Sequence, residues 1–294
     1  MSKSNVTNKE FAKRTLAYAF ELKCYSGQKL DKHITEGIRV KCNASSNSGR
    51  FNKNLFPNSK LLKLAQKRGR SARETFNYYT LPWQGGGVRI LPASTFHKFI
   101  ARVNSEISLF EDAARDFCVN YQGEVDNAML DHVALGRMFD ARDYPHVSDI
   151  QDLFSAELKP RPVSTSDDFR VGLTDTYLKQ IKSEYEDELN ESRQDANKAL
   201  WTRLQAVVEA MSERLSQPKA VFRDSLVENV RELTDVMDGL NIFEDKDLED
   251  FTNEIRDTLT GADPKELRND AKVRKTQADK ATNILGRMRK AGMA

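Results

Sequence analysis

The sequence contains little cysteine, and its few cysteines form no pattern. Cys24, Cys42 and Cys118 are the only three among 294 residues, and none stands in a C-x-x-C pair. Three widely spaced thiols cannot build a disulfide framework, which indicates a reducing compartment. No stretch approaches the roughly 20 apolar residues that a membrane helix needs. The first residues, MSKSNVTNKEF, lack the apolar core of a signal peptide, so we expect a soluble, cytoplasmic protein without membrane contacts.

Motifs of enzyme active sites are absent as well. No phosphate-binding G-x-x-x-x-G-K-S/T or G-x-G-x-x-G is present, and no serine stands in a G-x-S-x-G elbow. The triplet Gly85–Gly87 precedes a short apolar run instead of opening a helix, which indicates a tight turn. The histidines, His33, His97, His132 and His146, lie far from one another and from the cysteines, so no zinc-ligand spacing appears. We therefore predict that the chain is not an enzyme and holds no cofactor or metal.

Charge is distributed very unevenly along the chain, although the net charge is only +2. Residues 1–100 carry 19 Lys/Arg and 5 Asp/Glu, whereas residues 101–262 carry 18 and 35. Residues 263–294 return to a basic balance of 9 to 4. A basic segment of this size is typical of a surface that meets a polyanion, and nucleic acid is the first expectation. The alternatives are mutual neutralisation within the molecule or between copies, an acidic protein partner and, ranked last, an anionic membrane.

The first 173 residues mix helical and strand patterns. We expect helices near residues 8–16, 29–42, 57–76, 94–121, 124–138 and 148–157, and strands at 19–25, 88–91, 158–164 and 169–173. In the second of these helices, Leu30, Ile34, Ile38 and Val40 are predicted to face inward. Together the patterns predict a basic α+β domain with a small sheet over residues 1–173.

From residue 174 onward the pattern changes to long helices. Residues 174–217 contain neither proline nor glycine, and apolar stripes at helical spacing continue over 222–240 and 248–259. Short connections between such helices are typical of an antiparallel bundle. The chain is therefore predicted to be mainly α (α+β), with an acidic helical bundle at 174–262 and a basic C-terminal helix or tail at 263–294.

The first helix of the bundle is about twice as long as the second. One end of its apolar stripe therefore either packs on the helix expected at 248–259 or stays open to another copy. The residues at this end are Tyr177, Ile181, Tyr185 and Leu189. We expect them to form a surface for self-association, as in a coiled coil, or for a stable partner.

Cations stand beside aromatic residues between positions 50 and 83. Lysine and arginine neutralise phosphates with release of counterions, and an exposed tyrosine ring can stack on an unpaired base. The alternative is that Phe76, Tyr79 and Trp83 belong to the core, in which case the cations alone face water. Lys60 is expected at an exposed position of the helix that begins near residue 57. The predicted nucleic-acid-binding residues are Arg50, Lys53, Lys63, Lys67, Arg68, Arg70, Arg73 and Tyr78.

Six segments carry a resemblance to a known family. They are SGQKLDKHITE at 26–36, GRFNKNLFP at 49–57, TLPWQGGGVRILPA at 80–93, MFDARDYP at 138–145, DDFRVGL at 167–173 and AVFRDSLVENVRELTDVMDGLN at 220–241. From Tyr25 onward the chain resembles a family catalogued only as a domain of unknown function, found in phages, integrative elements and bacteria. Members are often encoded near MoxR-type AAA+ ATPases, von Willebrand A proteins and phage recombination or single-strand-binding genes. The resemblance implies a role in DNA metabolism or as an ATPase partner, in the host cytoplasm where a phage encodes the protein, and it assigns no catalytic residue.

The charge pattern and the resemblance together predict a non-catalytic DNA-binding protein of phage or mobile-element type, acting in DNA replication, recombination or protection. The alternative is an oligomeric adaptor or scaffold for a MoxR-type AAA+ ATPase, without direct contact to nucleic acid.

Overall fold

The computed structural model describes residues 8–130, 135–165, 175–217 and 223–290. The chain forms two compact units: unit 1 contains residues 1–19, 77–99 and 160–294, and unit 2 contains residues 20–76 and 100–159. The predicted segment 1–173 thus contributes to both units, while residues 174–294 belong to unit 1 alone. Helices dominate and small sheets accompany them, which confirms the predicted mainly α, α+β fold.

The larger sheet has the strand order β4-β5-β1-β6. Its strands are β4 (Leu81–Pro82), β5 (Val88–Pro92), β1 (Thr15–Lys23) and β6 (Ser155–Arg161). β1 runs antiparallel to β5, with Thr15 opposite Pro92 and Ala19 opposite Val88. The turn predicted between β4 and β5 is confirmed: Gln84 and the three glycines after it have φ values between 46° and 79°, which glycine adopts without strain.

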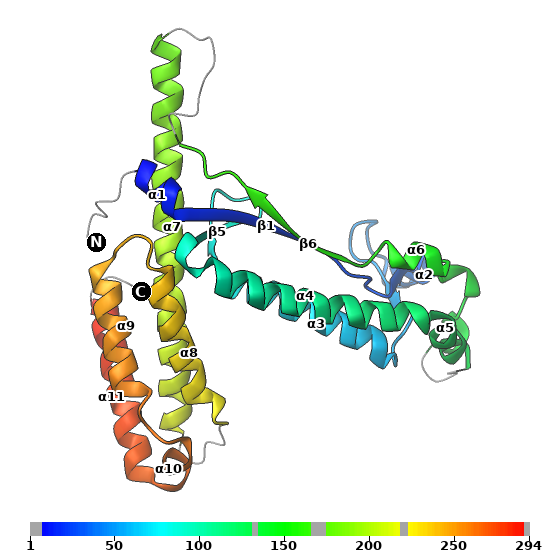
Figure 1. Cartoon of the computed structure of the whole chain (residues 1–294). Coiled ribbons are helices and arrows are strands. Elements are labelled where there is room, and N and C mark those ends of the chain that lie inside the picture. The colour runs from blue at the N-terminus through cyan, green and yellow to red at the C-terminus, as the bar shows by residue number, and fades with distance from the viewer. Residues whose placement is uncertain (1–7, 131–134, 166–174, 218–222, 291–294) are drawn as a thin grey trace. The chain divides into compact units, whose positions relative to one another are not determined.

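Unit 1 is built around the long helix α7 (Asp175–Ser216), which at 42 residues extends about 63 Å. Three further helices pack along its C-terminal part (Figure 1): α8 (Ser225–Leu240), α9 (Lys246–Leu259) and α11 (Ala271–Lys290), with the short α10 (Pro264–Asn269) before the last. Short connections join them, which confirms the predicted bundle. The basic C-terminal segment supplies one of its helices.

Segments far apart in sequence complete the core of unit 1. Leu204 of α7 and Ala281 of α11 have no exposed surface. The N-terminal helix α1 (Asn8–Arg14) joins them through Phe11, whose ring centroid lies 5.0 Å from that of Trp83 and 5.9 Å from that of Phe243. The core therefore ties the N-terminus and the β4–β5 turn to the bundle.

Two arginines of unit 1 donate hydrogen bonds to the residues at the C-terminal end of α3 (Lys60–Tyr78). Arg89 donates to the hydroxyl and the carbonyl of Thr80, each at 2.8 Å. Arg203 of α7 donates to the carbonyls of Asn77, Tyr78 and Thr80 at 2.9, 3.1 and 2.7 Å. Carbonyl groups at a helix C-terminus lack partners within the helix, and cations are favoured beside them. Burial, and then the charge of Arg203, lower the pKa of Arg89 to about 10.

Unit 2 has a separate core made largely of aromatic rings. α4 (Phe96–Val119) and α5 (Tyr121–Leu130) contribute Phe117 and Tyr121, and loops bring Tyr25, Phe56 and Phe154 against them. Ring centroids in this cluster lie between 5.5 and 6.4 Å apart. The short helix α6 (Val147–Gln151) follows two 3-10 helices, Gly136–Met138 and Ala141–Asp143.

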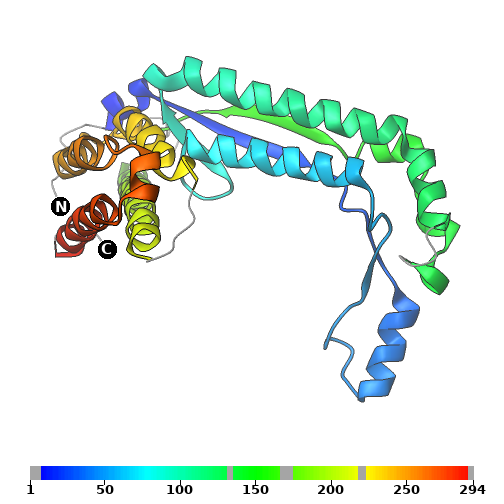
Figure 2. The same ribbon diagram turned by 90° about the horizontal axis from the view of Figure 1, so that it is seen from below.

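A helix and a two-stranded ribbon extend from this core as an arm, residues 28–54 (Figure 2). The strands β2 (Gln28–Leu30) and β3 (Asn52–Asn54) pair antiparallel, and α2 (Lys32–Cys42) lies between them in sequence. Asp31 caps α2 by accepting a hydrogen bond from the Ile34 N–H at 2.9 Å, and Asn43 ends the helix in the left-handed conformation.

The prediction that α2 packs inward is wrong. No residue of α2 is buried, and Ile38 and Val40 expose 48% and 73% of their surface. Leu30, assigned to the same helix, belongs to β2, because Asp31 starts the helix later. Apolar residues at helical spacing indicated a core face, but the arm leaves that face without a neighbour in the described chain.

Three other elements differ from the prediction. The first strand begins at Thr15, inside the stretch assigned to a helix, and the helix expected at 124–138 ends at Leu130. The helix expected at 148–157 ends at Gln151 and gives way to β6. Pairing of β6 with β1, a partner distant in sequence, overrides local preference there. The strand predicted at 169–173 lies outside the described residues.

Arg203→Met is expected to lower the free energy of unfolding of unit 1 by about 2–3 kcal/mol, because the three hydrogen bonds from Arg203 to carbonyl groups are lost, although Arg89 still donates to the Thr80 carbonyl. Urea denaturation followed by tryptophan fluorescence reports on unit 1, which contains Trp83 and Trp201. The control is Arg115→Met, which removes only an exposed ion pair with Asp112 and should change stability little. Equal effects of the two changes would contradict the role assigned to Arg203.

Candidate nucleic-acid interface

One face of α3 carries a row of cationic side chains. Ser59 starts the helix by accepting a hydrogen bond from the Leu62 N–H at 3.0 Å. The face toward the core is formed by Leu62, Ala65, Gly69, Ala72 and Phe76. On the opposite face the exposed residues Lys60, Lys63, Lys67 and Arg70 recur at spacings of three and four. These four residues are called the α3 basic row.

The α3 basic row runs over eleven residues, from Lys60 to Arg70, and therefore covers about 15 Å of helix. That length matches about four phosphates of one DNA strand, which are spaced about 3.4 Å along the duplex axis. None of the four cations forms an ion pair with any part of the chain that the structure describes, although the Lys63 ammonium donates to the Pro57 carbonyl. Glu74, also exposed, follows one turn after Arg70 and ends the row.

The two other arginines predicted to bind nucleic acid from α3 lie away from this row. Arg68 is half-buried on the flank of the helix. The guanidinium of Arg73 donates to the Phe20 carbonyl at 2.7 Å and lies 4.7 Å from the centre of the Phe20 ring. Burial lowers the pKa of Arg73. The prediction of an exposed position is correct for Arg70 and wrong for Arg73, which anchors α3 to β1.

Lys53, also predicted to bind phosphate, is a buried structural residue. Its side chain is 7% exposed and forms ion pairs with Asp143 and, at 3.6 Å, with Asp31. The ammonium also donates to the Met138 carbonyl at 2.9 Å. Burial opposes its charge, but the hydrogen bond and charge of Asp143, together with Asp31, outweigh that effect and raise the pKa of Lys53. Lys53 therefore fastens the arm to the segment before α6, and its prediction as a phosphate ligand is wrong.

The aromatic residues that follow the basic row belong to the core. Phe76 and Trp83 expose 0% and 3% of their surface. Tyr78, predicted to stack on bases, packs against the core of unit 1 and makes an edge contact with Tyr79. Burial raises the pKa of Tyr78 to about 12. The alternative considered for the sequence therefore holds for the α3 basic row: its cations face water, and Tyr78 offers no stacking platform.

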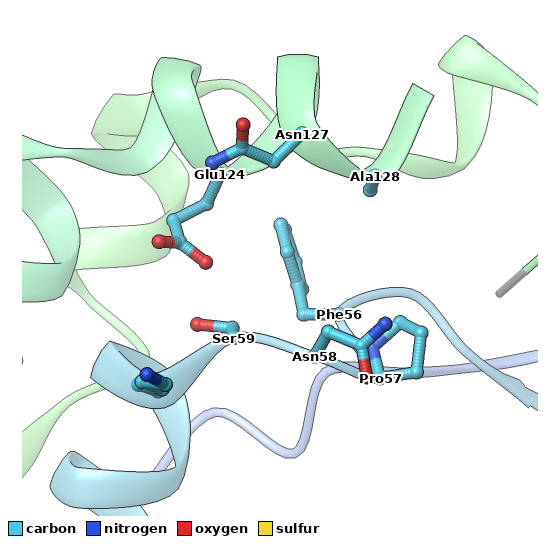
Figure 3. A pocket seen from close by; sticks show the side chains of 8 residues that line it. Phe56, Pro57, Asn58, Ser59, Glu124, Asn127 and Ala128 are labelled. Carbon is cyan, nitrogen blue, oxygen red and sulfur yellow. The ribbon is translucent and has the colours of Figure 1, made fainter. Parts of the chain in front are cut away.

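A hollow of about 310 Å³ lies between the first turn of α3 and α5 (Figure 3). Lys60, from the end of the basic row, contributes to its lining. Figure 3 shows the Glu124 carboxylate pointing from α5 toward Ser59. A carboxylate in this position repels phosphate, and Phe56 in the same lining is 3% exposed, too covered to stack on a base. The hollow therefore lies at one end of the basic row but adds no further phosphate-binding or base-stacking residue to it.

Cations of the arm form a second exposed group. Arg50 is exposed in the loop between α2 and β3, as predicted, and so are Lys29, Lys32 and Lys41. The sequence reasoning missed these three lysines because it placed their helix against the core. The Asp31 side chain at the N-terminus of α2 was the available signal that the helix begins after Lys29.

The uneven charge of the sequence is balanced within each unit. Unit 1 combines 28 Lys/Arg with 28 Asp/Glu, and unit 2 combines 18 with 16. In unit 2 the basic residues 20–76 fold together with the acidic residues 100–159, and in unit 1 the acidic bundle folds together with the basic termini. The field of a strongly basic domain is thus replaced by local charged faces, among them the α3 basic row.

The four residues predicted as a partner surface on α7 differ in exposure. Tyr177 exposes 64% of its surface and Ile181 is half-buried. The Tyr185 hydroxyl accepts a hydrogen bond from Gln84 at 3.1 Å, and Leu189 is 4% exposed in the core of unit 1. The prediction is therefore wrong for Leu189, because the open part of the stripe ends before it.

In the described ranges, no group of three or more His, Cys, Asp or Glu side chains is placed to hold a metal ion. None of the helices in these ranges has the length and apolar character needed to cross a lipid bilayer. Comparisons with known proteins found no matching family model, no matching curated protein and no matching solved structure.

Lys53→Met is expected to destabilise the foot of the arm by about 3 kcal/mol, because Asp31 and Asp143 would keep their charges without the cation. Amide hydrogen exchange in residues 28–54 should become faster. Arg50→Met, an exposed cation of the same arm, should leave exchange unchanged. Similar protection in both variants would show that the ion pairs do not hold the arm.

Proposed function

We propose that the chain is a non-catalytic nucleic-acid-binding protein that contacts the phosphate backbone, in the first place of DNA, through the α3 basic row. The observation that carries this proposal is the alignment on one helix of Lys60, Lys63, Lys67 and Arg70, which are exposed and have no carboxylate partner among the residues that the structure describes. A fixed row of cations releases counterions from several neighbouring phosphates at once.

The mode of binding that fits this row is independent of base sequence. Contacts to phosphate position a protein on nucleic acid but carry no sequence information directly. The rings of Phe76, Tyr78 and Trp83 are covered, so stacking on bases adds nothing at this site. The resemblance to a family of phages and mobile elements supports a role in DNA replication, recombination or protection.

The triple variant Lys63→Glu, Lys67→Glu and Arg70→Glu is expected to weaken DNA binding at least about tenfold, with the same loss on unrelated sequences. The slope of log K against log salt should fall by about 2–3, since about 0.7–0.9 is lost for each phosphate contact. Fluorescence anisotropy with labelled single-stranded and duplex DNA across a salt series measures both quantities.

A matched control changes three exposed lysines of α11, Lys272, Lys275 and Lys280, to glutamate, which alters the total charge by the same amount. Equal losses in the two variants would show that total charge, and not the α3 basic row, determines binding. Absence of binding to any DNA or RNA at low salt would reject the proposal. It would also favour the alternative role as an adaptor of a MoxR-type AAA+ ATPase, which stays a prediction from the resemblance.

A further inference from the structure

The surface around the α3 basic row offers no aromatic ring on which a base could stack. In the described part of unit 2, every Phe and Tyr side chain is buried or half-buried. The two tryptophans, Trp83 and Trp201, belong to the core of unit 1. Proteins that bind single strands combine a cationic surface with aromatic side chains, and each stacked base adds to the affinity. The row therefore lacks the component that favours unpaired bases.

The uncharged side chains beside the row offer no group for an unpaired base either. The Gln66 amide donates to the carbonyls of Tyr25 and Ser26, each at 3.1 Å, so it is already engaged within the chain. Leu64, which follows Lys60 by one turn, is exposed but aliphatic. A ligand at this face therefore meets cations and little else, and cations bind phosphate oxygens whether or not the bases are paired.

Packing fixes the axis of α3 along the row. At Gly69 a Cβ atom would lie 3.2 Å from the Phe110 ring, so the helix passes close to α4 there. The hydrogen bonds of Gln66 and Arg73 hold the same helix against β1 and the residues that follow it. The backbone positions of the four cations are therefore fixed. A ligand whose phosphates also have fixed spacing binds such a row without first being ordered.

We infer that the α3 basic row is a site for duplex DNA and discriminates against single strands, an inference that rests on the proposed function. A duplex holds its phosphates at regular intervals, with one charge per about 1.7 Å of axis when both strands are counted. Its bases are already paired and stacked, so the absence of aromatic partners costs it nothing. A single strand carries fewer charges along its length, must be ordered on the row and gains no stacking in return.

Carboxylates limit the row at both ends. Glu74 follows one turn after Arg70, and the Glu124 carboxylate points toward Ser59, just before Lys60 (Figure 3). About four phosphates of one strand fit between these ends. The slope of log K against log salt should therefore be about 3–4 in magnitude for a duplex and about 2–3 for a single strand, since each phosphate contributes about 0.9 and about 0.7 respectively.

The full chain should bind a duplex at least about tenfold more tightly than a single strand of the same length and sequence at about 50 mM salt. The sequence is chosen so that the single strand does not fold on itself, and fluorescence anisotropy gives both affinities. The triple variant Lys63→Glu, Lys67→Glu and Arg70→Glu should lose this preference, because the row produces it. The α11 variant with the same change in charge should keep it.

An aromatic side chain placed beside the row should supply the missing stacking. Leu64 is 40% exposed and lies one turn from both Lys60 and Lys67. Leu64→Trp should therefore raise the affinity for the single strand at least about fivefold and change the affinity for the duplex less than about twofold. Leu64→Ala is the matched control and should change neither affinity. Circular dichroism checks that both variants keep the helical content of the wild type.

A single strand that binds as tightly as the duplex, or more tightly, would overturn the inference and leave the proposed function intact. A duplex preference that persists in the triple variant would also overturn it, because another surface would then cause the preference. The same holds if Leu64→Trp leaves single-strand affinity unchanged, since stacking would then not be what the row lacks. Absence of binding to every nucleic acid at low salt would reject the inference together with the proposed function.

Discussion

Much of unit 1 depends on the hydrogen bonds that two arginines donate to carbonyl groups at the C-terminal end of α3. Arg89 comes from β5 and Arg203 from α7, and both donate to carbonyl groups between Asn77 and Thr80. Two guanidinium groups so close repel each other, yet both donate to carbonyl groups at the end of a helix, where partners within the helix run out. Burial, and then the charge of Arg203, lower the pKa of Arg89. Through these bonds a sheet strand, a bundle helix and the last turn of the basic helix share one network.

Local faces, and not whole segments, carry the charge of the folded chain. The sequence has a basic first third and an acidic centre, but each unit contains segments from both of these regions. The folded chain keeps four cations on one side of α3 and a cationic arm. Nucleic acid is therefore proposed to use one local face of unit 2, the α3 basic row.

Periodicity predicted the long elements and the turns well. The bundle helices, the α3 helix and the glycine turn at residues 84–87 follow from local pattern alone. Periodicity could not predict pairing between distant strands. The bounds of β6, for example, depend on its pairing with β1. Burial was predicted where a helix has a full apolar stripe and mispredicted on α2, because the stripe of an isolated helix does not reveal whether anything covers it.

The residues of the candidate site also divide into those that local periodicity predicts and those whose partners are distant in sequence. Exposure of Lys63, Lys67 and Arg70 followed from the helical period, since the opposite face of α3 had to be the core. Lys53 and Arg73 could not be separated from them by sequence, because their partners, Asp143 and the Phe20 carbonyl, are supplied by other parts of the fold. Tyr78 failed as a base platform for the same reason: the core of unit 1 covers it.

The borders between the two units lie within helices and strands, and not in loops. The borders fall after Ala19 in β1, after Phe76 in α3, after Phe99 in α4 and after Lys159 in β6. Recombination that replaces residues 20–159 would carry unit 2 together with Leu81, Trp83 and Ile90, which belong to the core of unit 1. Neither unit can be exchanged between related genes as a single contiguous segment, so both must be inherited, and must diverge, together.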